Sequence, residues 1–181
     1  MKNESMSEGL SEVPRVMALS EAKALFASLP PVDVPQMIGR WHGVSIATGH
    51  STDLLLDNSG WCGKKFESAD IVHPLIHKSI LGEVYLNPGL IPFTIFESLG
   101  VAEWPLMPHI FLLLNPLFST RKPRARLRLV DHEGVASAAM VYDQLPIIDY
   151  FRRINDTQLM GKMDRKGDEE PLFFKLISKK D

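Results

Sequence analysis

Beyond Pro35, the chain consists largely of short runs in which apolar and polar residues alternate, separated by turn-forming residues at intervals of roughly 8 to 15 residues. In a strand, successive side chains lie on opposite faces, which gives this period of two. Closely spaced turns allow neighbouring strands to pair antiparallel. The spacing continues almost to the C-terminus. This pattern predicts a mainly β, antiparallel sandwich or barrel.

The clearest strand pair lies in residues 124–142. In its first arm arginines alternate with apolar residues, a turn follows at Asp131–Gly134, and the return arm is rich in alanine. If Val130 pairs with Val135, the leucines, two of the alanines and Met140 share one face. Side chains this small predict either an interior cavity or close packing of a helix against the strand, and the pattern does not choose between them.

Two segments show helical spacing instead. Leu19–Leu29 has a candidate N-cap in Ser20 and is followed by a Pro-Pro pair that prevents continuation. Pro146–Ile154 has an acidic residue early and two arginines late, as the helix dipole favours. We therefore expect a short N-terminal helix and a second short helix just before the last two strands, Thr157–Met163 and Leu172–Ile177.

The chain has 181 residues, of which 45% are hydrophobic and 23% are charged, so we expect one globular domain with a packed core. We expect residues 1–18 to form a disordered lead. Residues 19–80 and 81–181 then complete one barrel between them. Five prolines in Leu81–Phe118 predict edge strands or long loops in that part of the chain.

The charge balance and the lack of targeting signals exclude several classes of protein. A net charge of −2 and a pI near 6.3 lack the basic excess of a nucleic-acid-binding domain. Residues 1–13 contain no apolar stretch like that of a signal peptide. The most apolar later segment, Met107–Phe118, is far below the ~20 residues that cross a bilayer. We expect a cytoplasmic protein that neither binds nucleic acid nor inserts into membranes.

Cysteine and histidine usage argues against a metal site. Cys62 is the single cysteine and cannot form an internal disulfide or a cysteine-based zinc cluster. His73 and His77 have the i, i+4 spacing of a helical metal pair, but Pro74 lies between them and no glutamate accompanies them as in H-E-x-x-H. None of the six histidines stands out as a haem ligand. We therefore expect no metal and no cofactor.

The pentapeptide at residues 39–43 reads G-R-W-H-G. On a strand its two glycines lie on the same face as Trp41 and clear space for a large ring or a closely crossing backbone. Trp41 is therefore a candidate plug at one end of a barrel, and a bulky core residue is the alternative.

Several polar residues are candidate anchors for a ligand. His50 and Asp53 are three residues apart, and a carboxylate can set the tautomer and basicity of an imidazole for general-base chemistry. In the alternative interpretation Asp53 caps a turn. Lys64 and Arg152 can bind an anionic headgroup inside an apolar pocket, or they can form structural ion pairs with carboxylates such as Asp149.

Taken as a set, these motifs resemble a known family. The matching N-terminal motifs are Gly39–Gly43, Thr48–His50, Asp53, Trp61–Phe66 and Val72–Leu75. They are similar to the GXWXG family, a bacterial and fungal domain named for its pentapeptide. Motifs from Tyr142 to Gly167 resemble the companion domain of unknown function that usually follows it. The resemblance spans about Leu19 to Leu176 and implies no established activity.

By pattern alone, a G-x-W strand preceded by a helix also resembles the lipocalin and fatty-acid-binding barrels and the nitrobindin haem barrels. We therefore expect a lipocalin-like (calycin-type) antiparallel β-barrel that holds a small hydrophobic molecule, such as a lipid, a fatty acid or an apolar metabolite. The predicted ligand-binding residues are Trp41, His50, Asp53, Trp61, Lys64, Phe66, His73, Met140, Tyr142 and Arg152.

Two alternative functions remain open. The first is an isomerase or cyclase that uses the same cavity for acid/base chemistry, which requires His50 and Asp53 to meet His73 or Tyr142. The second is a structural or dimerising module that uses the prolines and apolar residues of Leu90–Leu117. The sequence assigns no catalytic residue and leaves the oligomeric state open, a homodimer included.

Overall fold

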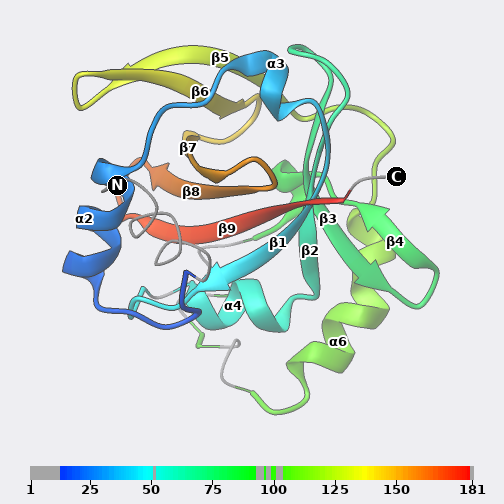
Figure 1. The fold of residues 1–181 in the computed structure, drawn as a ribbon. Coiled ribbons are helices and arrows are strands. Elements are labelled where there is room, and N and C mark those ends of the chain that lie inside the picture. Colours follow the sequence, from blue (N-terminus) through cyan, green and yellow to red (C-terminus); the bar gives the residue numbers. More distant parts are fainter. Residues whose placement is uncertain (1–12, 51, 93–95, 97–98, 101–103, 180–181) are drawn as a thin grey trace.

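The computed structural model describes residues 13–50, 52–92, 96, 99–100 and 104–179. Within these residues, nine strands form one antiparallel sheet (Figure 1). The strands are β1 (Gly39–Ile46), β2 (Trp61–Phe66), β3 (Val72–Ser79), β4 (Gly82–Tyr85), β5 (Ala125–His132), β6 (Val135–Tyr142), β7 (Ile147–Asn155), β8 (Gln158–Arg165) and β9 (Leu172–Lys179). The helices are α2 (Leu19–Ser28), α3 (Val34–Met37), α4 (Asp53–Asn58) and α6 (Met107–Leu114), with 3-10 turns η1 (Pro88–Leu90) and η3 (Asn115–Phe118).

Eight of the nine strands close into a barrel. The order around the sheet is β2-β1-β9-β8-β7-β6-β5-β3, and β2 pairs with β3 to complete the ring, while β4 extends from β3. The junction of β3 with β5 is short, since Val72 pairs with Ala125 there, and the Leu127 N–H adds a bond of 2.7 Å to the carbonyl of Ala69. The prediction of a mainly β antiparallel barrel is therefore confirmed.

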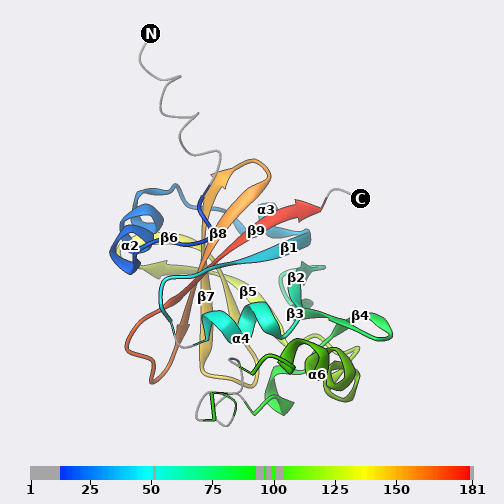
Figure 2. The ribbon, with the colours of Figure 1, turned by 90° about the horizontal axis from the view of Figure 1, so that it is seen from below.

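The N-terminal helix is confirmed as α2, although it begins at Leu19 with Ala18, and not Ser20, at the N-cap. The Glu21 carboxylate instead accepts the Ala18 N–H at 3.1 Å. Phe26 is buried on the outside of the barrel, in a cluster that includes Ala139. Figures 1 and 2 show α2 on one side of the molecule, well away from α6.

The predicted disordered lead, residues 1–18, lies mostly outside the described residues. The described part, residues 13–18, contacts the barrel. Val16 forms a parallel bridge with Ala47, the Met17 N–H donates to the carbonyl of Ala47 at 3.1 Å, and Val13 is buried. These contacts extend the outer cluster beneath α2.

The hairpin of β5 and β6 forms with a register two residues away from the predicted one, since Val130 pairs with Ser137. A shift of two preserves the faces, so Leu127 and Met140 both point into the barrel as predicted. Of the two predicted roles of the small residues, the structure shows packing of a helix against the strand, and none of these alanines lines a cavity. Ala138 lies among the interior residues, and Ala139 lies outside beneath α2.

The predicted helix over Pro146–Ile154 is wrong, because residues 147–155 form strand β7. Both faces of β7 are covered. Phe151 points into the barrel, and Tyr150 and Ile154 pack in the outer cluster. A strand buried on both faces loses the alternation of apolar and polar residues, and here the remaining pattern imitates helical spacing.

The barrel interior is filled at one end. Helix α3 closes that end, at the top of Figure 1, and the carbonyl of its Met37 accepts the Trp41 Nε1–H at 2.8 Å. Phe66, Phe151 and Met140 are fully buried beneath it. Helices α4 and α6 lie at the opposite end. Among the described helices, none has both the length and the hydropathy that a bilayer span requires.

Candidate functional site

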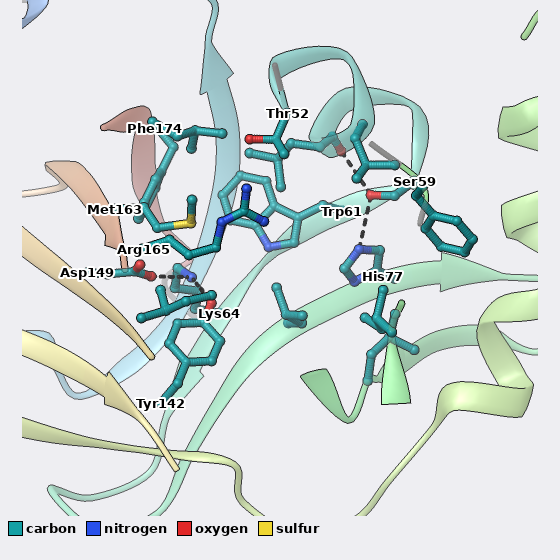
Figure 3. Close-up of a pocket in the computed structure, with 18 of the residues that line it drawn as sticks. Thr52, Ser59, Trp61, Lys64, His77, Tyr142, Asp149, Met163, Arg165 and Phe174 are labelled. Carbon is teal, nitrogen blue, oxygen red and sulfur yellow. Dashed lines mark hydrogen bonds and ion pairs between the residues drawn. The ribbon is translucent and has the colours of Figure 1, made fainter. Parts of the chain in front are cut away.

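A cavity of about 90 Å³ lies where the barrel meets α4 and α6, and it is partly open to solvent. Most of its lining side chains are apolar and come from both the strands and the covering helices. Among them are Trp61, Leu75, Phe111, Ile147, Met163 and Phe174. Three charged residues, Lys64, Asp149 and Arg165, also line it (Figure 3).

An irregularity in β2 turns both Trp61 and Lys64 toward the cavity. Residues three apart on a regular strand point to opposite faces. The pairing of β2 with β3 shifts register on either side of Gly63, which has a φ of 137°. A Cβ at Gly63 would lie 1.9 Å from the carbonyl oxygen of Trp41, so only glycine allows this crossing.

Two other glycines make room for the aromatic walls of the cavity. A Cβ at Gly43 would lie 2.2 Å from the Trp61 indole, and one at Gly161 would lie 2.2 Å from the Phe174 ring. The two rings meet edge to face, with centroids 5.6 Å apart. The glycines around Trp41 were expected to clear space for a ring, and the ring that Gly43 accommodates belongs to Trp61.

The Lys64 ammonium is buried inside the barrel. Its Nζ lies 2.8 Å from Oδ2 of Asp149 and donates to the carbonyl of Pro74 at 3.2 Å and to the Tyr142 hydroxyl at 3.5 Å. Nζ also lies 4.9 Å from the ring centroid of Phe174 and 5.6 Å from that of Trp61. A buried charge needs such a set of partners, because burial removes it from water.

Burial also shifts the protonation equilibria of the neighbouring groups. It raises the pKa of the Asp149 carboxyl above its usual value, against the opposing effect of the Lys64 charge. Burial raises the pKa of Tyr142 well above its usual value, and the Asp149 charge adds to this rise. Burial, aided by the Lys64 charge, lowers the pKa of His77 to about 3. His77 is therefore neutral at physiological pH, with its Nε2 3.1 Å from the Ser59 hydroxyl.

Three polar atoms of the lining residues are buried without a hydrogen-bond partner among the described residues. They are Nε1 of Trp61, Oδ1 of Asp149 and Nδ1 of His77, whereas Oδ2 of Asp149 is held by its ion pair with Lys64. The Tyr142 hydroxyl accepts from Lys64, which leaves its own hydrogen to donate. The cavity therefore combines apolar walls with donors and an acceptor that can bind a polar group of a guest molecule.

His50 and Asp53 lie beside the cavity without lining it. Oδ2 of Asp53 accepts the backbone N–H groups of Thr48, Gly49 and His50 at 2.8 to 3.0 Å, so Asp53 caps this turn. The His50 imidazole contacts other groups. Its Nδ1 lies 2.7 Å from the Thr52 hydroxyl, and its Nε2 lies 3.5 Å from Asp168. The predicted use of Asp53 to orient the imidazole is therefore not observed.

His73 and Arg152, also predicted to bind a ligand, lie away from the cavity. His73 stacks on Tyr85 with ring centroids 4.2 Å apart, and its Nε2 lies 3.7 Å from Glu67. Arg152 is buried on the outer face of the barrel, with its guanidinium 5.2 Å from the ring centroid of Phe26. The acid/base alternative requires His50 and Asp53 to meet His73 or Tyr142. Of these four residues, Tyr142 alone lines the cavity.

The predicted residues divide into three groups. Trp61, Lys64 and Tyr142 line the cavity, while Trp41, Phe66 and Met140 belong to the filled end of the barrel. His50, Asp53, His73 and Arg152 lie elsewhere. The prediction of binding residues treated Asp149 only as a structural partner, because it lies in the segment interpreted as a helix. On a strand, Ile147, Asp149 and Phe151 share one face, which would have placed a carboxylate in the barrel.

The part of the chain that the structure describes contains no group of three His, Cys, Asp or Glu side chains placed to hold a metal ion. Burial raises the pKa of the Cys62 thiol to about 11, with the Glu83 charge adding to the rise. A thiol with so high a pKa stays protonated and is a poor nucleophile at neutral pH.

Comparisons with known proteins agree with the resemblance in the motifs. A family model described as GXWXG protein matches residues 24–82, and one described as domain of unknown function DUF4334 matches residues 123–177. The fold is similar to a crystal structure of a protein from Thermomonospora curvata, with a TM-score of 0.67 and 30% sequence identity. The match covers 97% of this chain and 95% of that one. No curated protein matches the sequence.

Proposed function

This chain belongs to the family that joins a GXWXG domain to a DUF4334 domain, and from its cavity we propose that it binds a small, mostly apolar molecule. The observation that carries the proposal is a partly enclosed apolar cavity between the barrel and the helices α4 and α6, with one ion pair facing it. Ligand pockets are commonly apolar with a few placed polar groups. A lipocalin-like relationship is part of the same proposal, since eight-stranded barrels can hold one small ligand.

The size of the cavity limits the part of the ligand that it encloses. Its volume of about 90 Å³ is smaller than the roughly 150 Å³ of an apolar cavity known to bind benzene. A lipid or fatty acid therefore has to project through the opening, or the covering residues have to move. A compact head that enters the barrel, with the remainder at the opening beside α4 and α6, fits this volume.

A ligand screen tests the proposal. Native mass spectrometry of gently purified protein should show a retained apolar molecule, and apolar compounds should raise the melting temperature, because binding at 100 times Kd stabilises by about 2.7 kcal/mol. Leu75→Trp places a bulky ring in the lining and should abolish both effects. The exposed Leu129→Trp is the control and should preserve them. The proposal fails if no compound stabilises the protein and no retained mass is found.

Proton transfer on the bound molecule, as in an isomerase or cyclase, is a second candidate function. The observation favouring it is that Asp149 and Tyr142 face the cavity with raised pKa values, and such shifts are common at catalytic sites. The test is exchange of carbon-bound hydrogen in a bound ketone, followed by NMR in D₂O. Exchange should depend on Asp149 and survive Asp143→Asn, a surface carboxylate paired with Arg126. Exchange no faster than in buffer would exclude this candidate.

A further inference from the structure

The polar atoms of the cavity that lack a partner determine which chemical group can enter it. Nε1 of Trp61 is a buried donor without an acceptor among the described residues, and Oδ1 of Asp149 is a buried acceptor without a donor. The Tyr142 hydroxyl still has its hydrogen to donate. Leaving such groups unpaired away from water is unfavourable, so a guest that pairs them binds better than one that does not.

These groups surround one point, next to the Lys64 ammonium. Nζ of Lys64 lies 2.8 Å from the Asp149 carboxylate, 3.5 Å from the Tyr142 hydroxyl and 5.6 Å from the centroid of the Trp61 ring. In Figure 3, Tyr142, Asp149 and Trp61 are all grouped around Lys64. The polar end of a guest that reaches Lys64 therefore meets these side chains.

The charges around that point balance. The Lys64 cation is paired with Asp149, and Arg165 is paired with Asp168 through two contacts of 2.9 Å. An anionic head would add a second negative charge beside Asp149, and a cationic head would meet Lys64, both in surroundings that penalise net charge. A pure hydrocarbon would leave the Trp61 donor unpaired.

We propose that the guest carries an uncharged oxygen, of a carbonyl or a hydroxyl group, at the end that enters the barrel between Trp61 and Tyr142. This inference rests on the proposed function. A carbonyl oxygen can accept from both donors, and a hydroxyl can in addition donate to Oδ1 of Asp149. Carboxylates such as fatty acids are thereby disfavoured.

Four compounds of one shape test the inference: ethylbenzene, acetophenone, 1-phenylethanol and benzoate. Their affinities are measured at pH 7 by NMR titration of the isotope-labelled protein. We expect acetophenone or 1-phenylethanol to bind roughly tenfold more tightly than ethylbenzene, the gain of one or two hydrogen bonds, and benzoate to bind more weakly than either. The ketone and the alcohol distinguish a guest that only accepts from one that also donates.

Two variants test whether Trp61 and Tyr142 cause the tighter binding of the oxygen compounds. Trp61→Phe removes the indole donor and Tyr142→Phe removes one hydroxyl, and each should reduce the advantage of acetophenone over ethylbenzene severalfold while leaving ethylbenzene binding unchanged. Trp104→Phe is the matched control, because Trp104 is 52% exposed and does not line the cavity. Tyr142→Phe keeps the test decisive if Trp61→Phe does not fold.

Each outcome has a distinct meaning. Equal binding of ethylbenzene and the two oxygen compounds, or tightest binding of benzoate, overturns the inference and leaves apolar binding intact. Tighter binding of an oxygen compound that is unaffected by both variants also overturns it. If none of the four compounds binds, the proposed function itself is overturned. The expected order, lost in the variants and kept in Trp104→Phe, supports the inference.

Discussion

Lys64 and Asp149 are both removed from water, and each makes the burial of the other tolerable. Their side chains are 3% and 1% exposed. In such pairs, the loss of hydration is large and the mutual attraction offsets it only when both partners are present. The pair therefore contributes little to net stability as a unit, yet either residue alone is strongly destabilising.

Replacing Lys64 by methionine should lower the free energy of unfolding by about 3–5 kcal/mol, because it leaves Asp149 buried without a counter-charge. The double variant Lys64→Met with Asp149→Leu should recover most of this loss, since no charge then remains in the cavity. Guanidinium unfolding at pH 7 measures both values. A single variant within 1 kcal/mol of the wild type would contradict the ion-pair account.

His77 makes stability depend on pH. Because burial lowers its pKa to about 3 in the folded protein, against 6.5 in the unfolded chain, only the unfolded chain binds a proton between these values. Stability should therefore fall as the pH decreases from 6.5 toward 3, by about 1.4 kcal/mol per unit. The raised pKa of Asp149 acts in the opposite direction, since its protonation at low pH favours the folded state.

The contribution of His77 is isolated by comparison with a variant. His77→Gln keeps a polar group near Ser59 and should give a shallower decrease in unfolding free energy between pH 6.5 and 4 than the wild type. The exposed His109→Gln serves as the control. Identical pH profiles for His77→Gln and the wild type would mean that His77 is not held neutral in the folded state.

Among the elements, β2 is the one on which the site depends most, because its irregularity at Gly63 directs Trp61 and Lys64 to the same side. Gly63→Ala should destabilise the protein by about 3 kcal/mol or more, since it adds a collision with the backbone of Trp41 to an unfavourable φ. Gly82→Ala is the control. Its φ is 91° but no atom lies within 4 Å of the added carbon, so about 1 kcal/mol is expected. Urea unfolding measures the free energy of unfolding of both variants. Equal losses in the two variants would contradict the predicted collision at Gly63.

The sequence predicts elements well where one face of a strand meets solvent. The arginines of β5 mark its outer face, and its faces follow correctly even though the register differs by two residues. β7 fails because both of its faces are covered, so its pattern loses the period of two. Because the pattern of β7 predicts a helix, Asp149 is not recognised from the sequence as a residue that faces the barrel interior. Lys64 and Tyr142 are recognisable as candidates from residue type, whereas the irregularity that turns Trp61 inward depends on a backbone crossing that no local pattern reveals.

In the whole molecule, the two family-matched segments build one sheet. Residues 24–82 contain β1 to β3 and the first residue of β4, and residues 123–177 contain β5 to β8 and most of β9. β1 pairs with β9 over seven residues, from Arg40 to Ile46, and β3 pairs with β5. The cavity takes Trp61 and Lys64 from the first segment and Tyr142 and Asp149 from the second. Neither segment contains a complete site.

We therefore predict that the two halves do not fold alone. Residues 13–122 without the rest lose the partner strand of β1 and leave Trp41 and Phe66 exposed, while residues 123–181 leave the interior face of β5 to β9 uncovered. Circular dichroism of each half should lack a cooperative thermal transition, and the full chain should unfold in a single one. Mixing the halves should restore a native-like circular dichroism signal, because ordinary strand pairing joins the two halves. A cooperative transition in either half alone would show that the barrel consists of two independently stable domains.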